Sequence, residues 1–258
     1  MNKILLYDQF KAASLSGLKK ISVLIDPDKV GVKQLEKIVN ISINSGIDYF
    51  FIGSSILINE NLDYIVKTIK ESCDIPLILF PGSTYQVNKE ADAILFLSLI
   101  SGRNPELLIG NHVITAHLLQ QSRLEIISTG YMLIDGGIMS SVQYMSNTVP
   151  IPHTKNDIAV STALAGEMLG LKQIYLEAGS GAKFPVSESM ISMVKNSINI
   201  PLIVGGGIST PERAAKSALA GADMIVIGNI VEKDPMIVKD ISHAVHSQSN
   251  VEKTVLGS

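Results

Sequence analysis

The sequence has no tryptophan, one cysteine and few charged side chains. Only 17% of its 258 residues are Asp, Glu, Lys or Arg, and the formal net charge is −3. Because this charge is small and the 21 Lys and Arg residues are scattered, the composition gives no general attraction to nucleic acid or anionic lipid. Any anionic ligand must therefore be held locally. The lone Cys73 cannot form an internal disulfide, which suits a reducing cytosol and predicts a cytoplasmic protein.

Long hydrophobic runs are also missing. No apolar stretch approaches the roughly 20 residues that a membrane-spanning helix needs. The first ten residues, MNKILLYDQF, offer only four consecutive apolar residues before Asp8, too few for the core of a signal peptide. We therefore expect an unexported protein without a transmembrane segment. Its mean hydropathy of +0.31 is high for such a protein, which favours a subunit interface or an apolar ligand groove.

Short apolar runs alternate with helical patterns along the whole chain. Eight runs are nearly continuous in Val, Ile, Leu and Phe, as expected of parallel strands that helices cover. They begin at residues 21, 49, 76, 93, 124, 173, 201 and 223. Eight strand–helix units predict an α/β fold, the (βα)8 or TIM barrel, whose active site lies at the C-terminal ends of the strands. A doubly wound open sheet is the alternative. We expect one domain over residues 1–258, with a helical segment at 1–20 covering the barrel.

One of the predicted helices has clear boundaries. In STPERAAKSALAGA, Ser209 or Thr210 can cap the N-terminus, Pro211 suits the first turn, and Gly221 follows the last residue. A long insert, residues 134–156, is rich in Gly, Ser, Met and Thr and is the candidate mobile lid.

Three glycine-bearing segments follow the last three predicted strands: EAGSGA, VGGGIS and IGN. In a barrel these strand ends are neighbours, and the loops after strands seven and eight form a recurrent phosphate site. Each glycine can instead merely permit a tight turn, but three such loops at adjacent ends favour an anion site at the C-terminal ends of strands 6–8. The backbone N–H groups that would converge on one phosphate, with the Ser180 hydroxyl beside them, belong to Gly179, Ser180, Gly181, Gly206, Gly207, Gly228 and Asn229.

Glu177 stands at the end of the sixth predicted strand, two residues after Tyr175. The alternation of a strand points both side chains to one side, at the expected mouth of the barrel. A phosphate would repel the carboxylate, so we assign Glu177 to hydroxyl groups of the ligand. The alternative is an acid that faces solvent.

Two carboxylates follow the first predicted strand, in LIDPDK. Asp-Pro-Asp is an ordinary turn and helix-cap signal. In a barrel, however, Asp26 is the first polar residue at the mouth. A lone carboxylate suits Mg²⁺, because this ion takes one or two carboxylates and leaves positions for diphosphate oxygens and water. Ser54 or Ser55, after the second strand, can complete such a site.

The five histidines form no metal-ligand pattern. We assign His112, His117, His243 and His246 to structural or surface roles. His153 borders the insert, and its role stays open.

Six motifs, spread from the first predicted strand to the eighth, together resemble the geranylgeranylglyceryl phosphate synthase family. They are LIDPDK, FLSLISGRNPELLIG, IPHTKNDIAVSTALAGEMLG, YLEAGSGA, VGGGIS and IGN. The resemblance implies an Mg²⁺-dependent prenyltransferase on a modified (βα)8 barrel. Such enzymes join geranylgeranyl diphosphate or another polyprenyl diphosphate to the 3-hydroxyl of sn-glycerol 1-phosphate, which makes the ether bond of archaeal-type lipids. It also implies a homo-oligomer, a dimer or hexamer, that releases its product at the membrane periphery.

The resemblance assigns roles to individual residues. Asp26 and Ser55 match the metal ligands, and the implied mechanism makes Asp26 and Glu177 catalytic. The positions that match the glycerol phosphate site are Tyr175, Leu176, Glu177, Ala178, Gly179, Ser180, Gly181, Gly206, Gly207, Gly228 and Asn229. Candidates for a prenyl groove, with core packing as their alternative role, are Phe80, Phe96 and Leu97. One bacterial branch carries Lys where this chain has Leu24, which argues against that branch and its longer donor.

Two other functions remain open from the sequence. The first is another glycerol-phosphate-type barrel enzyme, similar to indole-glycerol-phosphate synthase. Enzymes of that kind place a lysine at early strand ends, whereas the third strand here ends in LILFPG, without a basic residue. The second is a non-catalytic barrel that binds a phospholigand.

Overall fold

The chain folds as a closed barrel of eight parallel strands in chain order. The computed structural model describes residues 4–59 and 61–250, so residues 1–3, 60 and 251–258 of the predicted domain lie outside the described part. The strands are β1 (Lys20–Ile25), β2 (Tyr49–Ile52), β3 (Leu77–Leu79), β4 (Ala93–Leu99), β5 (Glu125–Leu133), β6 (Gln173–Glu177), β7 (Leu202–Gly205) and β8 (Met224–Ile227). Because β1 pairs with β8, with Lys20 opposite Met224, the barrel is confirmed and the open sheet is excluded.

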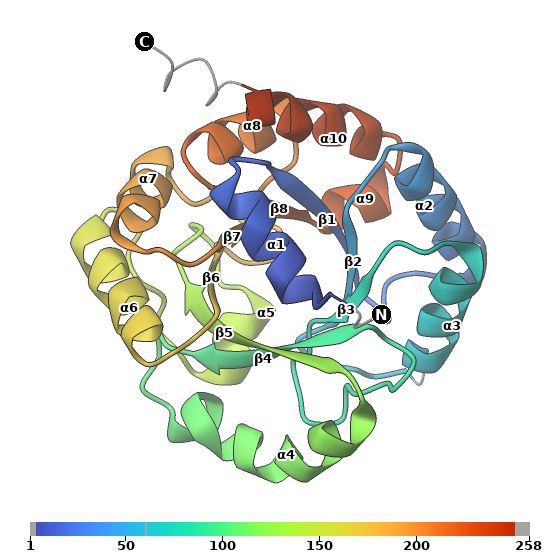
Figure 1. The fold of residues 1–258 in the computed structure, drawn as a ribbon, viewed down its shortest axis with the longest axis horizontal. Coiled ribbons are helices and arrows are strands. Elements are labelled where there is room, and N and C mark those ends of the chain that lie inside the picture. Colours follow the sequence, from blue (N-terminus) through green and yellow to red (C-terminus); the bar gives the residue numbers. More distant parts are fainter. Residues whose placement is uncertain (1–3, 60, 251–258) are drawn as a thin grey trace.

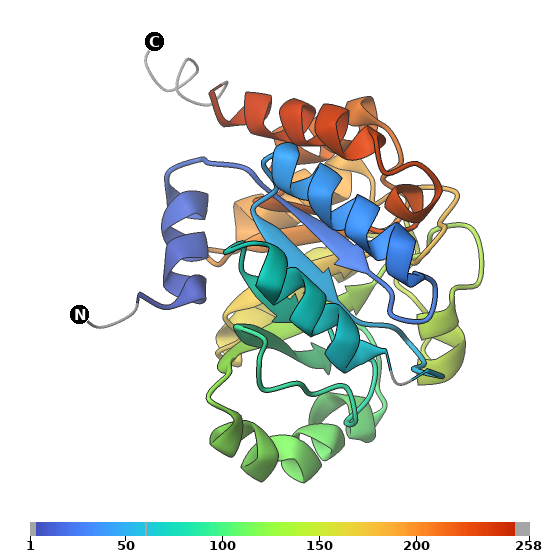
Figure 2. The ribbon, with the colours of Figure 1, turned by 90° about the vertical axis from the view of Figure 1, so that its right-hand side faces the viewer.

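Helices surround the barrel, as Figure 1 shows. The surrounding helices are α2 (Val32–Asn44), α3 (Leu62–Ser72), α4 (Asn111–Ser122), α6 (Asn156–Met168), α7 (Glu188–Ser197), α8 (Pro211–Leu219) and α10 (Ile237–Ser247). A π-helical turn, Glu106–Gly110, precedes α4, and a 3₁₀ turn, Gln248–Asn250, follows α10. Three further helices are α1 (Leu6–Leu15), α5 (Ser141–Ser146) and α9 (Asn229–Lys233). Figure 2 shows α1 at one end of the barrel and α5 and α9 at the other. No helix in the described ranges is long and apolar enough to cross a membrane.

The core has two layers because side chains of a strand alternate between its two faces. In β6, Leu176 packs in the layer between barrel and helices, whereas Tyr175 packs inside the barrel. Both are fully buried. This burial on both faces is why the strands read as continuous apolar runs in the sequence.

Helix α1 closes the N-terminal end of the barrel. Its buried side chains include Leu6, Tyr7 and Phe10, which join the cluster inside the barrel. Both oxygens of Glu125, the first residue of β5, accept hydrogen bonds from the start of α1, from the N–H of Leu6 at 2.5 Å and of Tyr7 at 2.8 Å. A carboxylate at this end of a helix also faces the positive pole of its dipole. The predicted helical segment within residues 1–20 thus corresponds to α1.

The start of α8 agrees with the capping pattern. Thr210, rather than Ser209, is the N-cap, and its hydroxyl accepts from the N–H of Arg213 at 3.3 Å. Pro211 occupies the first turn, and Gly221 has a φ of +121°, which a residue with a side chain rarely adopts.

Three aspartates tie neighbouring strands together at the N-terminal end of the barrel. Each directly precedes a strand, accepts a hydrogen bond from a backbone N–H at the start of the preceding strand, and pairs with a lysine. The groups are Asp48 with Lys20 and the N–H of Ile21, Asp92 with Lys70 and the N–H of Leu77, and Asp223 with Lys195 and the N–H of Leu202. These pairs fix the ends of β1–β2, β3–β4 and β7–β8.

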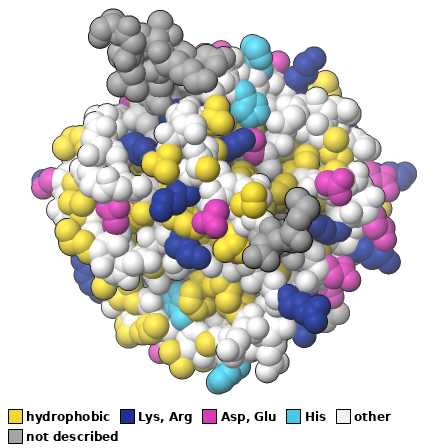
Figure 3. Space-filling view, in the orientation of Figure 1, with side chains coloured by type: hydrophobic (Ala, Val, Ile, Leu, Met, Phe, Trp, Pro, Cys, Tyr) yellow, Lys and Arg dark blue, Asp and Glu magenta, His cyan; other side chains and the backbone are white. Residues whose placement is uncertain are grey.

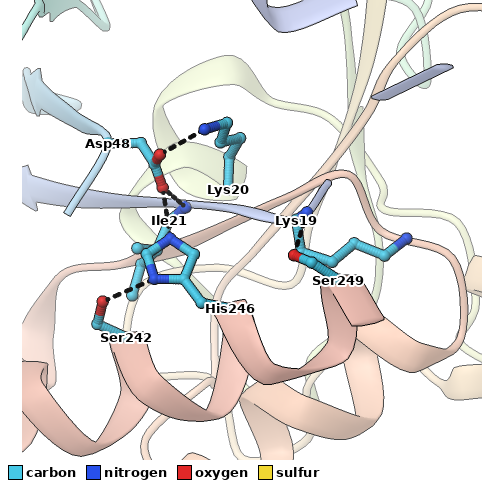
Figure 4. A network of polar contacts seen from close by, with 7 residues as sticks. All are labelled: Lys19, Lys20, Ile21, Asp48, Ser242, His246 and Ser249. Atoms are coloured by element: carbon cyan, nitrogen blue, oxygen red, sulfur yellow. Dashed lines mark hydrogen bonds and ion pairs between the residues drawn. The ribbon is translucent and has the colours of Figure 1, made fainter. Parts of the chain in front are cut away.

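The Asp48 group also holds α10, as Figure 4 shows. Asp48 accepts from the N–H of Ile21 at 2.9 Å and from Lys20 Nζ at 2.7 Å, and His246 Nε2 lies 2.9 Å from Asp48 Oδ2. Although burial raises the pKa of Asp48, its contacts with His246, Lys20 and Ile21 lower that pKa below the usual value. The carboxylate is therefore stabilised in its charged form.

Candidate active site

A cavity of about 880 Å³ opens at the C-terminal ends of the strands. One side is polar and is lined by residues that follow β1, β2, β7 and β8 and by the end of β6. The other side is apolar and is lined by Phe80, which follows β3, and by residues of β4 and α4. Such a mixed cavity can hold a ligand with a charged head and a hydrocarbon tail.

The three glycine loops meet at the polar side of this cavity. Ser180, after β6, donates a hydrogen bond through its hydroxyl to Asn229 Oδ1, after β8, at 2.8 Å. Gly206, after β7, lies so close to Glu177 that a Cβ there would stand 2.5 Å from Oε1 and 2.6 Å from the backbone nitrogen of Gly179. The loops after β6, β7 and β8 are therefore neighbours, as the barrel prediction requires.

Four glycines in these loops have backbone conformations that favour glycine. The φ angles are +98° at Gly179, +75° at Gly181, +83° at Gly206 and +69° at Gly207. Backbone in such conformations can aim successive N–H groups at one point and form an anion-binding nest. Together with the helix N-terminus at Asn229, the loops offer several N–H donors to a phosphate.

Glu177 is the buried acid of the cavity. Its side chain is only 7% exposed, and Oε1 accepts a hydrogen bond from the N–H of Gly179 at 2.7 Å. Burial raises the pKa of Glu177 to about 7, although the hydrogen bond from the N–H of Gly179 and the nearby Tyr175 hydroxyl lower it in part. A carboxyl group with this pKa can take up and release a proton near neutral pH, which suits a general base.

Three aromatic rings lie below Glu177 inside the barrel. Phe80 stacks on Tyr175 with ring centroids 5.2 Å apart, and Tyr131 meets both rings edge-on, at 5.6 Å from Phe80 and 5.4 Å from Tyr175. All three line the cavity. The Tyr175 hydroxyl and Glu177 Oε2 both lie against Gly205, where a side chain would collide with them. Glycine at this position thus makes room for the two inward-facing side chains.

The structure separates the two carboxylates of LIDPDK. Asp28 accepts hydrogen bonds from the N–H groups of Ile58 and Asn59, both at 2.8 Å, and from Asn59 Nδ2 at 3.0 Å. Desolvation raises the pKa of Asp28, but these three hydrogen bonds together outweigh it and lower the pKa. Asp28 therefore anchors the loop after β2, and its oxygens are occupied.

Asp26 is the carboxylate that remains available to a ligand. It lines the cavity, its Oδ1 accepts from the N–H of Asp28 at 3.1 Å, and its Oδ2 lies 2.9 Å from Lys29 Nζ. Ser54 and Ser55 line the same side of the cavity, and the backbone of Ser54 is held by Gln86 through two hydrogen bonds. The donors are hard oxygen atoms, which fit Mg²⁺. No group of three or more His, Cys, Asp or Glu within the described ranges is arranged to hold a metal, so other ligands would have to come from substrate and water.

Comparison with known proteins agrees with this geometry. Residues 18–245 match the sequence profile of the PcrB family. The chain belongs to the PcrB family. A geranylgeranylglyceryl phosphate synthase of Chitinophaga pinensis is 50% identical over 252 residues, which cover 98% of this chain and 99% of the relative. Another from Thermococcus gammatolerans is 44% identical over 218 residues, 84% of this chain and 86% of the relative.

A solved structure of the same enzyme from Thermoplasma acidophilum, in complex with the substrate sn-glycerol-1-phosphate, superposes with a TM-score of 0.89. It is 33% identical, and the match covers 95% of this chain and 99% of that one. The family membership predicted from the six motifs is thus confirmed, and so is the barrel fold.

Most of the predicted site residues of this PcrB family member lie in the cavity wall. Tyr175, Glu177, Ser180, Gly181, Gly206, Gly207, Gly228, Asn229, Asp26 and Ser55 line it. Leu176 and Ala178 instead pack in the layer between barrel and helices, so only their backbone can face the site. Gly179 contributes its N–H to Glu177.

The apolar side includes the three side chains proposed for a prenyl groove, Phe80, Phe96 and Leu97, all only partly buried. It also includes His112, for which the sequence predicted a structural or surface role. The imidazole meets the Phe96 ring edge-on at 4.3 Å, and burial lowers the pKa of His112. The spacing of His112, Thr115 and Leu119 marks one helix face, a signal that could have placed His112 on the wall.

The candidate lid, residues 134–156, contains α5. Ser140 caps this helix by accepting from the N–H of Gln143, and α5 lines the cavity with Val142 and Met145 among others. His153 lies outside the cavity lining, where its Nδ1 is 3.9 Å from Asp135 Oδ2.

Proposed function

We propose that this PcrB family member joins geranylgeranyl diphosphate to the 3-hydroxyl of sn-glycerol 1-phosphate and so makes an ether lipid precursor. The observation that carries the proposal is a buried Glu177 with a pKa of about 7, placed between an anion-binding set of glycine loops and an apolar cavity wall. The names of the relatives and the glycerol phosphate complex of the Thermoplasma enzyme support the same substrates.

Glycerol phosphate would bind with its phosphate on the three loops. The backbone N–H groups at Ser180–Gly181, Gly206–Gly207 and Gly228–Asn229 would supply the donors. The N–H of Gly179, which the sequence also assigned to the phosphate, is instead bonded to Glu177 Oε1. Glu177 faces the glycerol hydroxyls, because its carboxylate and the phosphate repel each other and must lie at opposite ends of the ligand.

The diphosphate of the prenyl donor would lie beside Asp26 and Ser55, which we propose as ligands of Mg²⁺. When bound there, Mg²⁺ neutralises negative charge on the leaving diphosphate. The hydrocarbon chain would extend along the apolar side, over Phe80, Phe96 and Leu97. This arrangement brings the first carbon of the chain between the two polar groups.

The transfer needs one bond to break and one to form. The bond between C1 of the prenyl chain and the diphosphate oxygen breaks, and its electron pair leaves with the diphosphate. The 3-hydroxyl oxygen of the glycerol forms a bond to C1, and Glu177 accepts the hydroxyl proton. The aromatic cluster of Tyr131, Tyr175 and Phe80 lines the cavity and would make the surroundings of the allylic carbons apolar.

The decisive experiment incubates the protein with sn-glycerol 1-phosphate, labelled geranylgeranyl diphosphate and Mg²⁺. We expect label in an organic-soluble phosphoether, and a donor series analysed by mass spectrometry gives the preferred chain length. Absence of labelled product from protein that still binds glycerol phosphate would favour the non-catalytic barrel. Omission of Mg²⁺ is the control for the metal.

We also propose a cytoplasmic homo-oligomer, a dimer or hexamer. Apolar side chains on the outer face of α4, Val113, Ile114 and Leu118, are exposed and support burial of further surface. Light scattering in solution gives the mass as a multiple of 27.7 kDa.

A further inference from the structure

The carboxylate proposed as a metal ligand already pairs with a cation of this chain. Lys29 Nζ lies 2.9 Å from Asp26 Oδ2, three residues along the same loop. The lysine side chain is 46% exposed and the aspartate side chain 15%. The pair thus stands at the open mouth of the cavity, where one partner can leave without exposing any apolar core.

Other charges surround this pair. Glu232 and Lys233 of α9 line the same part of the cavity, and Glu232 interacts electrostatically with both Lys29 and Asp26. Asp28 also lines the cavity, but its oxygens are held by Ile58 and Asn59. The mouth therefore carries two carboxylates besides Asp28, those of Asp26 and Glu232, and the ammonium groups of Lys29 and Lys233.

A divalent cation on Asp26 conflicts with Lys29 in this position. Both would lie within about 3 Å of the same oxygen atom, where like charges repel strongly. The aspartate is fixed by its hydrogen bond from Asp28, whereas the lysine ends a flexible four-carbon stem that is half exposed. Lys29 is therefore the group that moves. Ser83 and Thr84, hydroxyl residues of the loop after β3, also line the cavity.

We propose that Lys29 is a placeholder cation. In the metal-free enzyme its ammonium group neutralises Asp26. When a divalent cation binds Asp26, the Lys29 side chain swings away and its ammonium group pairs with the diphosphate of the donor. This inference rests on the proposed function for the identity of the metal ligand and the diphosphate. It makes Lys29 a substrate-binding residue with opposite effects on two ligands. Lys29 competes with the metal when the metal binds alone, and it attracts the diphosphate that arrives with the metal. Metal and diphosphate consequently strengthen the binding of each other through one side chain.

Binding without turnover tests this proposal. We would measure free Mn²⁺ by electron paramagnetic resonance during titration of wild type, Lys29→Met and Lys37→Met, first alone and then with inorganic pyrophosphate. Lys37, exposed on α2, is the matched control for loss of one positive charge. We expect Lys29→Met to bind Mn²⁺ alone about two- to fivefold more tightly, as for loss of a solvent-exposed ion pair. We expect the same variant to bind pyrophosphate in the presence of Mn²⁺ about tenfold more weakly.

The opposite signs distinguish a placeholder from a structural ion pair. If Lys29→Met leaves Mn²⁺ affinity unchanged or weakens it, or if pyrophosphate binding is unaffected, the proposal is wrong while the proposed transferase function can stand. If wild type does not bind Mn²⁺ under either condition, the metal role of Asp26 and this proposal both fail.

Calorimetric binding of sn-glycerol 1-phosphate, whose loops Lys29 does not touch, shows that each variant is folded. Lys29→Arg, which keeps the charge, should restore most of the pyrophosphate affinity.

Discussion

The two ends of the barrel use the same strands for opposite purposes. At the N-terminal end, Asp48, Asp92 and Asp223 are each paired with a lysine and a backbone N–H, and α1 covers the interior. At the C-terminal end, glycines with positive φ replace side chains. The buried Glu177 accepts from the N–H of Gly179 and forms no ion pair with a basic residue in the described part of the chain. The charges on the face that carries α1 are of both signs and interspersed, as Figure 3 shows. Interactions that stabilise the fold are thus concentrated at the N-terminal end of the barrel, whereas residues at the C-terminal end serve binding and chemistry at a cost in stability.

We expect the largest effect from a substitution of Glu177 at the C-terminal end, which should reduce activity without reducing stability. Glu177→Gln keeps the shape and an acceptor for the N–H of Gly179 but removes the base. We expect kcat to fall by about 10²–10⁴-fold, with a free energy of unfolding at pH 8 no lower than in wild type, because a buried charge is removed. Steady-state transfer assays and urea unfolding measure the two quantities. A variant with near-normal kcat would contradict the role of Glu177.

A second substitution tests the metal at the same end. Asp26→Asn keeps the acceptor for the N–H of Asp28 but loses the charge, so we expect prenyl transfer to fall by roughly 10²–10³-fold even at saturating Mg²⁺. Near-normal turnover would reject Asp26 as a metal ligand. Asp28→Asn is the matched control, because Asp28 anchors a loop, and its loss should reduce stability more than the Mg²⁺ dependence of kcat.

At the N-terminal end the expected pattern is reversed. Asp223 is 1% exposed, accepts from the N–H of Leu202 at 2.7 Å and pairs with Lys195 at 2.6 Å. Asp223→Ala leaves the N–H of Leu202 unpaired and leaves Lys195 with only the Ser14 hydroxyl, so it should lower the free energy of unfolding by about 3–5 kcal/mol. The kcat of the folded fraction should stay near that of wild type. If the variant loses kcat but not stability in urea titrations, the division between the two ends is wrong.

The two ends should also respond to pH in opposite ways. Glu177 has a pKa raised to about 7 in the folded protein, so the folded state binds more protons than the unfolded state between pH 4.5 and 7. From this group alone, stability should therefore fall as pH rises through that window, by about 3 kcal/mol in total. Asp48 has a lowered pKa, and its contribution is present above pH 3.8 and is lost as pH falls further.

Unfolding curves from pH 3 to 8 check this difference. Glu177→Gln should remove the loss of stability between pH 4.5 and 7, and Asp48→Asn should remove the loss below pH 4. In wild type, kcat/KM should rise with pH through about 7, because the base must be ionised to accept the hydroxyl proton. A profile that is flat across pH 7 would contradict the assignment of Glu177 as the base.

Much of the fold could be predicted because strands that are buried on both faces appear in the sequence as continuous apolar runs. All eight predicted strands occur, each beginning within about a residue of the expected position. The ends of β4 and β5 were not predictable, since Ser98 and Gly130 interrupt the apolar pattern inside strands that pair through to Leu99 and Tyr131. Only the pairing partner decides where such a strand stops.

Site segments marked by glycines could be predicted from the sequence, whereas roles that depend on contacts between distant segments could not. The loops at Gly179 and Gly206 could be recognised because both positions have a positive φ and a neighbour too close for a Cβ, and both features favour glycine. Asp26 and Asp28 are the same residue type two positions apart. What separates them is the loop at Ile58–Asn59, which reaches Asp28 only in the folded chain. For His112, the spacing with Thr115 and Leu119 marks a helix face in the sequence, but the contact with Phe96 that brings this face to the cavity exists only in the folded chain.

The hydrogen bonds between α1 and Glu125 join parts of the chain that are 119 and 118 positions apart. During synthesis α1 leaves the ribosome long before β5 exists, so the helix has neither its cap nor the barrel interior to pack against. The nascent chain must carry the apolar face of α1 unprotected until half of the barrel has been translated. Assembly of this protein therefore has a late closing step, and fusions or deletions at its N-terminus should reduce the yield of folded protein before they change its chemistry.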